Sequence, residues 1–182
     1  MSIQLAILKS CTPEFVKIRM LKELFQITAR AFDCPVPPLQ GCSHAEILKR
    51  YALFTRVAAE KSMKTGCDLR ETRIRLFDQA CGLGRKFRKW LHIKSAQEAM
   101  ELGGYLYAML GIDFNGGSGG TIRINSCYFS TYYTDRICEL ISALDEGLLA
   151  GLSGGGRLSF YQRITAGQNC CLARFEAGGG GA

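Results

Sequence analysis

Apolar residues recur at helical spacing in four segments of the first 110 residues. These segments span residues 13–32, 43–65, 69–92 and 95–110, and each repeats its apolar side chains every three or four positions. The second segment begins with Ser43-His44-Ala45-Glu46, a sequence typical of a capping box at a helix start. The pattern predicts four amphipathic helices before any strand.

The period changes after the glycine-rich stretch NGGSGG at residues 115–120, which predicts a flexible loop. In residues 121–129, TIRINSCYF, apolar and polar positions alternate, as in a strand. This alternation places Ile122 and Ile124 on one face and Cys127 on the other.

Helical spacing returns over residues 131–150, and the glycine-rich residues 151–156 predict a loop. Residues 157–165 alternate again, and AGQN predicts a turn into a last strand, CCLARFE, at 170–176. The chain is therefore expected to be α+β, with a helical N-terminal half followed by a small antiparallel sheet. Its C-terminal part forms a strand-helix-hairpin unit.

The length of 182 residues suits one domain, which we assign to residues 1–176. The glycine-rich tail, residues 177–182, is expected to be disordered. No apolar run reaches about 18 residues and the N-terminus lacks a basic region before an apolar one, so neither a membrane span nor a signal peptide is expected. These features predict a cytoplasmic protein.

The formal charge of +7 is spread along the amphipathic segments, with one dense run from Arg85 to Lys89. Such a run is typical of a solvated helix face, and aromatic residues are not interleaved with it as in a single-strand-binding groove. The expected partner is therefore a small molecule rather than nucleic acid or a membrane. A metabolic anion is a further possibility, and the chain is a possible homo-oligomer.

Nine cysteines in a reducing compartment are not expected to form a disulfide framework. Cys138 and Asp145 are seven residues apart, so both project from one side of the predicted helix. Cys127 precedes that helix, while the neighbours Cys170 and Cys171 direct one thiol to each side of the last strand. Asp145 lies in an apolar segment and must be either at an exposed edge or paired.

Three runs, RINSCYFS, YYTDRICELISALDEG and RLSFYQRITAGQNCCLARF, resemble the L-2-amino-thiazoline-4-carboxylate hydrolase-like family. The resemblance covers roughly residues 40 to 175. The strand-helix-hairpin arrangement is similar, more distantly, to 4-vinyl-reductase-like domains, which look like small-molecule-binding modules. The positions that match the hydrolase-like pattern are Cys127, Cys138, Asp145, Gly167 and Cys171.

This resemblance implies a hydrolase that needs no cofactor and opens a carbon–nitrogen bond of a small cyclic amidine or thiazoline-like substrate. Cys127 or Cys171 is then the thiolate nucleophile, and Asp145 protonates the departing nitrogen or activates water. Arg163 and Cys138 are expected to bind the substrate, with Arg163 pairing a substrate carboxylate.

A second hypothesis is a sensor module in which cysteines hold zinc or an iron–sulfur centre, with Asp145 as a further ligand or acceptor. A third is a non-catalytic subunit that docks a partner through residues 13–32 or through the basic helix around Arg85. The sequence contains no CxxC motif to support the metal hypothesis. The four cysteines that it would use are Cys127, Cys138, Cys170 and Cys171.

Overall fold

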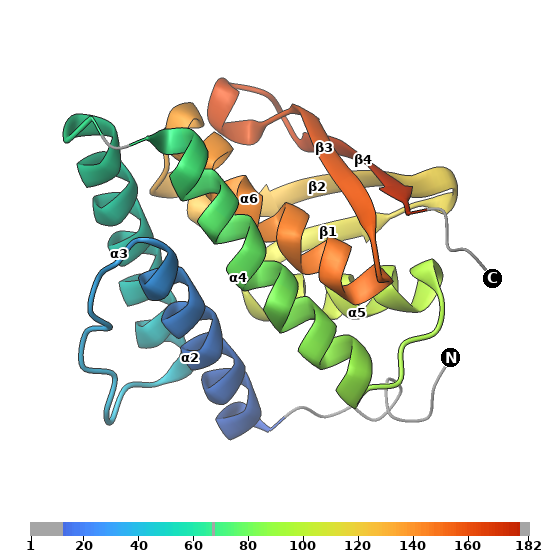
Figure 1. Cartoon of the computed structure of the whole chain (residues 1–182), viewed down its shortest axis with the longest axis horizontal. Coiled ribbons are helices and arrows are strands. Elements are labelled where there is room, and N and C mark those ends of the chain that lie inside the picture. The colour runs from blue at the N-terminus through green and yellow to red at the C-terminus, as the bar shows by residue number, and fades with distance from the viewer. Residues whose placement is uncertain (1–12, 67, 179–182) are drawn as a thin grey trace.

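The computed structural model describes residues 13–66 and 68–178. Within these ranges the chain forms five α-helices, and the first four precede every strand, as the apolar spacing predicts (Figure 1). The Ser43 hydroxyl accepts the Glu46 N–H in the expected capping box, and Ser95 caps the fourth helix. The helices are α2 (Glu14–Ala31), α3 (His44–Lys64), α4 (Leu69–Trp90), α5 (Ala96–Met109) and α6 (Asp135–Ser153).

Four antiparallel strands form one sheet in the order β1-β2-β4-β3, which confirms the α+β class. Side chains alternate between a buried and a solvent-facing side, so that Ile122 and Ile124 of β2 are buried while Arg123 is exposed. The central pair, β2 and β4, aligns Ile124 with Cys171. The strands are β1 (Ile112–Gly116), β2 (Thr121–Cys127), β3 (Gly156–Gln162) and β4 (Cys171–Ala177).

Helix α6 runs along the sheet and packs closely against α4 (Figure 1). The close approach depends on Gly84 of α4 and on Gly147 and Gly151 of α6. A Cβ atom at any of these positions would lie within 3.0 Å of a backbone oxygen of the opposite helix. Glycine is thus required there because the two backbones touch.

Several predicted boundaries were wrong at glycine-rich positions. Strand β1 was not expected, and its end overlaps the predicted loop at 115–120. Helix α6 continues through Gly151 to Ser153, and it ends at Gly154, which has a left-handed φ of 82°. Glycines inside α6 allow close packing against α4, whereas Gly154 allows the left-handed conformation that ends the helix.

Two strands, β2 and β3, also end earlier than predicted. Strand β2 ends at Cys127, before a 3-10 turn, and β3 ends at Gln162, so Arg163 follows the strand rather than belonging to it. Strand β4 includes Ala177, the first residue of the predicted tail, while residues 179–182 lie outside the described ranges. No helix in those ranges is both long enough and apolar enough to cross a bilayer.

Candidate functional site

A narrow cavity of about 100 Å³ lies between the helices and the buried side of the sheet. Most of the residues around it are apolar, including Leu83 of α4 and Leu148 of α6. The structure brings all five residues of the predicted site to this cavity. They are Cys127, Cys138, Asp145, Arg163 and Cys171.

Helix α6 supplies Cys138 and Asp145 to the cavity from positions two turns apart, as the spacing predicts. Strand β4 supplies Cys171, and Cys170 does not line the cavity. Instead, the Gln162 side-chain amide donates to the Cys170 carbonyl at 3.0 Å and lies 3.4 Å from its sulfur. Strand β4 begins at Cys171, so Cys170 precedes the strand instead of belonging to it as predicted, and the two adjacent cysteines have different environments.

Cys127 reaches the cavity because the pairing of β1 with β2 is irregular. Ile112 pairs with Cys127 and Phe114 pairs with Ile124, so two residues of β1 span three of β2. Such a bulge shifts the alternation of side chains by one position. Cys127 therefore lines the same cavity as Ile124, whereas strict alternation predicted opposite faces.

Asp145 is only partly buried, but its carboxyl group is removed from bulk solvent. Desolvation raises the pKa of this carboxyl from 3.8 to about 7, and the neighbouring charge of Glu146 adds to the effect. The hydroxyl of Tyr107 donates to Oδ1 at 2.7 Å and, with the charge of Arg163, opposes the rise in this pKa. Asp145 can therefore release and accept a proton near neutral pH.

Tyr107 is a site residue that the sequence interpretation missed. Its ring is buried and stacks on Phe114 of β1 at a centroid distance of 4.8 Å, which directs its hydroxyl toward Asp145. A tyrosine on an otherwise apolar helix face was a signal, because a buried phenol hydroxyl usually finds a hydrogen-bond partner. The identity of that partner was not visible in the sequence.

The three cavity thiols are held in their neutral form. Burial raises the pKa of Cys127 to about 12 and that of Cys138 to about 11. Burial also raises the pKa of Cys171, although the Ile164 N–H donates to its sulfur at 3.3 Å and the positive charge of Arg163 favours its thiolate. Since reactive cysteines need an electropositive surrounding, Cys171 is a better nucleophile candidate than Cys127.

The guanidinium of Arg163 has no carboxylate partner within ion-pair distance in the described ranges. Its Nε atom is buried without a hydrogen-bond partner, and its Cζ atom lies 5.3 Å from the centre of the Phe160 ring. Among the described residues, the guanidinium makes one weak hydrogen bond, from Nη2 to the Ser142 hydroxyl oxygen at 3.5 Å.

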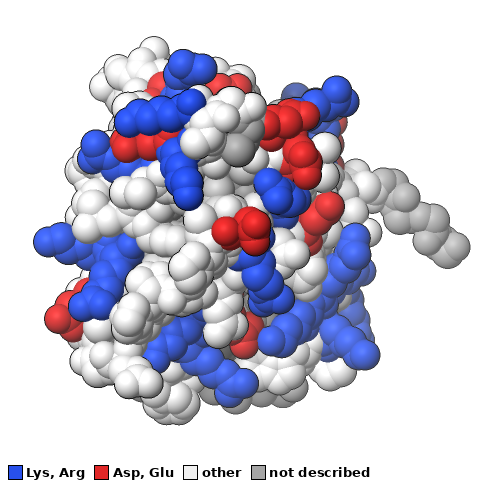
Figure 2. All heavy atoms as spheres, turned by 60° about the vertical axis from the view of Figure 1, so that its left-hand side comes forward, with Lys and Arg blue, Asp and Glu red and all other residues white. Residues whose placement is uncertain are grey.

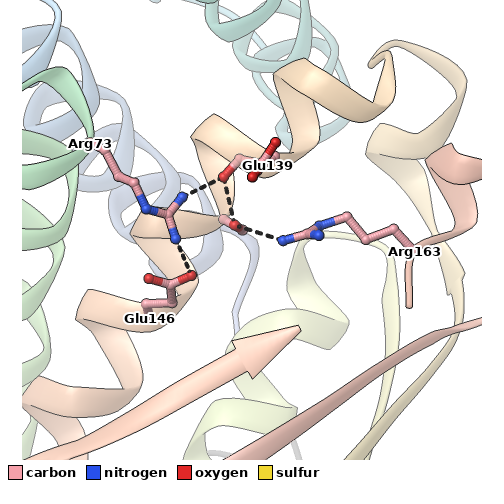
Figure 3. A network of polar contacts seen from close by, with 5 residues as sticks. Arg73, Glu139, Glu146 and Arg163 are labelled. Carbon is pink, nitrogen blue, oxygen red and sulfur yellow. Dashed lines mark hydrogen bonds and ion pairs between the residues drawn. The ribbon is translucent and has the colours of Figure 1, made fainter. Parts of the chain in front are cut away.

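A polar network joins Arg73 of α4 to α6 and reaches Arg163 through the Ser142 hydroxyl (Figure 3). The Ser142 hydroxyl donates to the Glu139 carbonyl at 2.7 Å, and Arg73 of α4 donates to the same carbonyl at 2.6 Å. Arg73 also pairs with Glu146, the carboxylate next to Asp145 in sequence. Glu146 is thus held by Arg73 and does not pair with Arg163.

The metal hypothesis requires several ligand side chains to lie close together. In residues 13–66 and 68–178, no group of three or more His, Cys, Asp or Glu side chains has an arrangement that could hold a metal ion. Cys170 is separate from the other three cysteines proposed as ligands. Neither His44 nor His92 lines the cavity.

Comparison with protein-family models found no match, and neither did searches of the curated proteins and of the solved structures.

Proposed function

We propose that this chain binds a small organic carboxylate in the cavity. The observation that carries the proposal is the unpaired guanidinium of Arg163, with a buried Nε that lacks a partner, beside an apolar cavity. A planar guanidinium binds a carboxylate through two parallel hydrogen bonds, which would supply the missing partner.

The size and polarity of the cavity restrict the ligand. A cavity of about 150 Å³ accommodates benzene, so the enclosed volume of about 100 Å³ admits a compound of that size or smaller, and a larger ligand requires the side chains around the cavity to move. The apolar lining favours an uncharged body, and Asp145 can accept or donate one hydrogen bond to a polar atom of it. Small heterocyclic carboxylates, including 2-aminothiazoline-4-carboxylate, have this combination of groups.

Calorimetric titration with 2-aminothiazoline-4-carboxylate and with its methyl ester tests the proposal. We expect Arg163→Met to weaken binding of the acid by roughly 10- to 100-fold, because a hydrogen bond to a charged group contributes about 1.5–3 kcal/mol. The ester should bind weakly to both proteins.

Arg157→Met is the matched control, because Arg157 lies on the exposed side of β3, only six residues before Arg163. This variant should bind the acid as the wild type does. Equal affinity for acid and ester, or an Arg163→Met variant with unchanged affinity, would contradict the proposal.

We propose hydrolysis of an amidine carbon–nitrogen bond as a second candidate function. The observation that favours it is the presence in one cavity of Cys171, whose sulfur accepts a backbone N–H, and of Asp145, whose pKa lies near 7. The Asp145 carboxylate would accept the thiol proton while the sulfur attacks the amidine carbon.

The rest of the reaction balances with one water molecule. The carbon–nitrogen bond breaks, and the departing nitrogen takes the proton from Asp145. Water then attacks the carbon bound to sulfur, which releases a carbamoyl product and restores the Cys171 thiol. None of the described residues that line the cavity is a histidine. Asp145 must therefore both accept the thiol proton and donate a proton to the departing nitrogen.

Product formation measured by mass spectrometry tests the hydrolysis. We expect Cys171→Ser and Asp145→Asn to lower turnover at least about 100-fold, in the range typical of a lost proton-transfer group. Cys127→Ser is the control and should keep most activity. If the wild type binds the acid but forms no product, the second candidate fails and the binding function stands.

A further inference from the structure

A second hollow, of about 860 Å³, lies on other faces of the same two helices, α4 and α6. None of the described residues that line this hollow is acidic. Lys and Arg are spread over the face of the molecule seen in Figure 2, and several gather at its lower right. The cationic and imidazole side chains that line the hollow are Arg85, Arg88, Lys89, His92 and Lys94.

Most of this positive charge is uncompensated. In the part of the chain that the structure describes, Arg85, Arg88 and Lys89 take part in no ion pair, although Lys86 beside them pairs with Glu23 at 3.1 Å. Lys94 is partly balanced, because its own backbone N–H holds the Glu98 carboxylate at 2.8 Å. In this part of α4, Lys86 is therefore paired, whereas the other three cations have no acidic partner among the described residues.

The glycine loop after α6 makes room for these side chains. Gly154 touches the guanidinium of Arg88 so closely that a Cβ atom there would collide with Nη1. The Gly155 N–H already donates to the Ala150 carbonyl at 2.9 Å. Binding in the hollow therefore depends on the arginine and lysine side chains rather than on this backbone N–H.

We infer that this hollow binds a compound that carries at least two phosphate groups. Three unpaired cations exceed what one carboxylate neutralises, and guanidinium groups bind phosphate oxygens in pairs. The volume is within the range of ligand sites, and Phe77 and Ile93 provide an apolar wall for the rest of the compound. This site is separate from the cavity of Arg163.

A purely structural role would have a different signature. Arg88 and Lys89 lie in the last turn of α4, where positive charge favours the exposed carbonyl groups of the helix end. That role predicts lower thermal stability on removal of the charges and no dependence on phosphate. The experiment therefore measures both unfolding and ligand binding.

Calorimetric titration with inorganic tripolyphosphate tests the inference on the wild type and on Arg85→Gln/Lys89→Gln. We expect the double variant to lose at least about tenfold in affinity and to unfold near the wild-type temperature, since both side chains are exposed. The matched control is Lys49→Gln/Lys64→Gln, which removes two exposed charges from α3. It should lose less than about twofold.

A pentaglutamate peptide distinguishes a phosphate site from a general attraction for acidic chains. Tripolyphosphate should bind at least about tenfold more tightly than the peptide in about 150 mM salt, where long-range attraction is screened. Tripolyphosphate should also shift the NMR amide signal of Gly155 in the wild type, a readout that needs no variant. Equal binding of the peptide, equal losses in both double variants or an unchanged Gly155 signal would overturn the inference.

Discussion

Residues of α4 and α6 line both the cavity and the basic hollow, but burial favours neutral groups in the cavity, whereas most charged groups of the hollow remain exposed. In the cavity, burial raises the pKa of Cys127 and Asp145, so both groups tend toward their neutral forms. In the hollow, Arg85 and Lys89 are exposed and keep a solvated charge. The same helix pair therefore offers proton exchange on one side and electrostatic attraction on the other.

The largest expected effect concerns the contact that separates these two regions. Gly147→Ala should destabilise the fold by about 3 kcal/mol or more, because its Cβ would overlap the Phe77 backbone of α4. Chemical denaturation measures this change. Gly82→Ala is the control: this exposed helical glycine has no neighbour within 4 Å of the added Cβ, so the variant should gain about 0.5–1 kcal/mol. Equal stability of both variants would mean that α4 and α6 do not touch at Gly147.

The next effect is the pH dependence that Asp145 imposes on stability. Its pKa is about 7 in the folded chain and near 3.8 without burial, so between these values the folded state holds a proton that the unfolded state has lost. Stability should fall by up to about 1.4 kcal/mol per pH unit as the pH rises toward 7, and it should level off above 7.

Asp145→Asn removes this slope, because the amide does not titrate and its oxygen can still accept from Tyr107. Relative to the wild type, the variant should be more stable at pH 8 than at pH 5, as measured by denaturation at both values. Asp78→Asn, an exposed change on α4, is the control and should not alter the slope. A wild-type stability that increases from pH 5 to pH 7 in comparison with Asp145→Asn would contradict the buried proton.

A smaller effect is expected from Tyr107→Phe, which removes only one hydroxyl. That hydroxyl stabilises the Asp145 carboxylate, so its loss should raise the pKa of Asp145 further. Carboxyl carbon NMR measures the titration directly. An unchanged or lower pKa in the variant would show that the 2.7 Å contact does not favour the ionised form.

Local sequence signals were sufficient for the helical part of the fold. The predicted bounds of α2, α3, α4 and α5 differ from the observed ones by at most two residues, since apolar spacing and the caps at Ser43 and Ser95 act within one helix. The shared placement of Cys138 and Asp145 follows from helical geometry alone. These features need no information about distant segments.

Features that depend on contacts between distant segments were not predicted. The five residues of β1 gain their strand structure from pairing with β2, and the bulge in that pairing decides the side of Cys127. The hydrogen bond from the Tyr107 hydroxyl to the Asp145 carboxylate joins residues 38 positions apart in the sequence. Spacing placed Cys138 and Asp145 on one side of the helix, whereas the raised pKa values of the cavity residues became apparent only with the fold.

The smallest effect is expected from Lys86→Gln, which tests where the basic hollow ends on α4. Lys86 is next to Arg85 on α4, but it lies outside the hollow and pairs with Glu23. An exposed ion pair contributes at most about 1 kcal/mol, so Lys86→Gln should change stability by about 0.5 kcal/mol and tripolyphosphate affinity by less than about twofold. Titration of Lys86→Gln beside Arg85→Gln measures the contrast. Similar losses in the two variants would mean that binding follows total charge rather than the position of each cation, and the hollow would then not be a defined site.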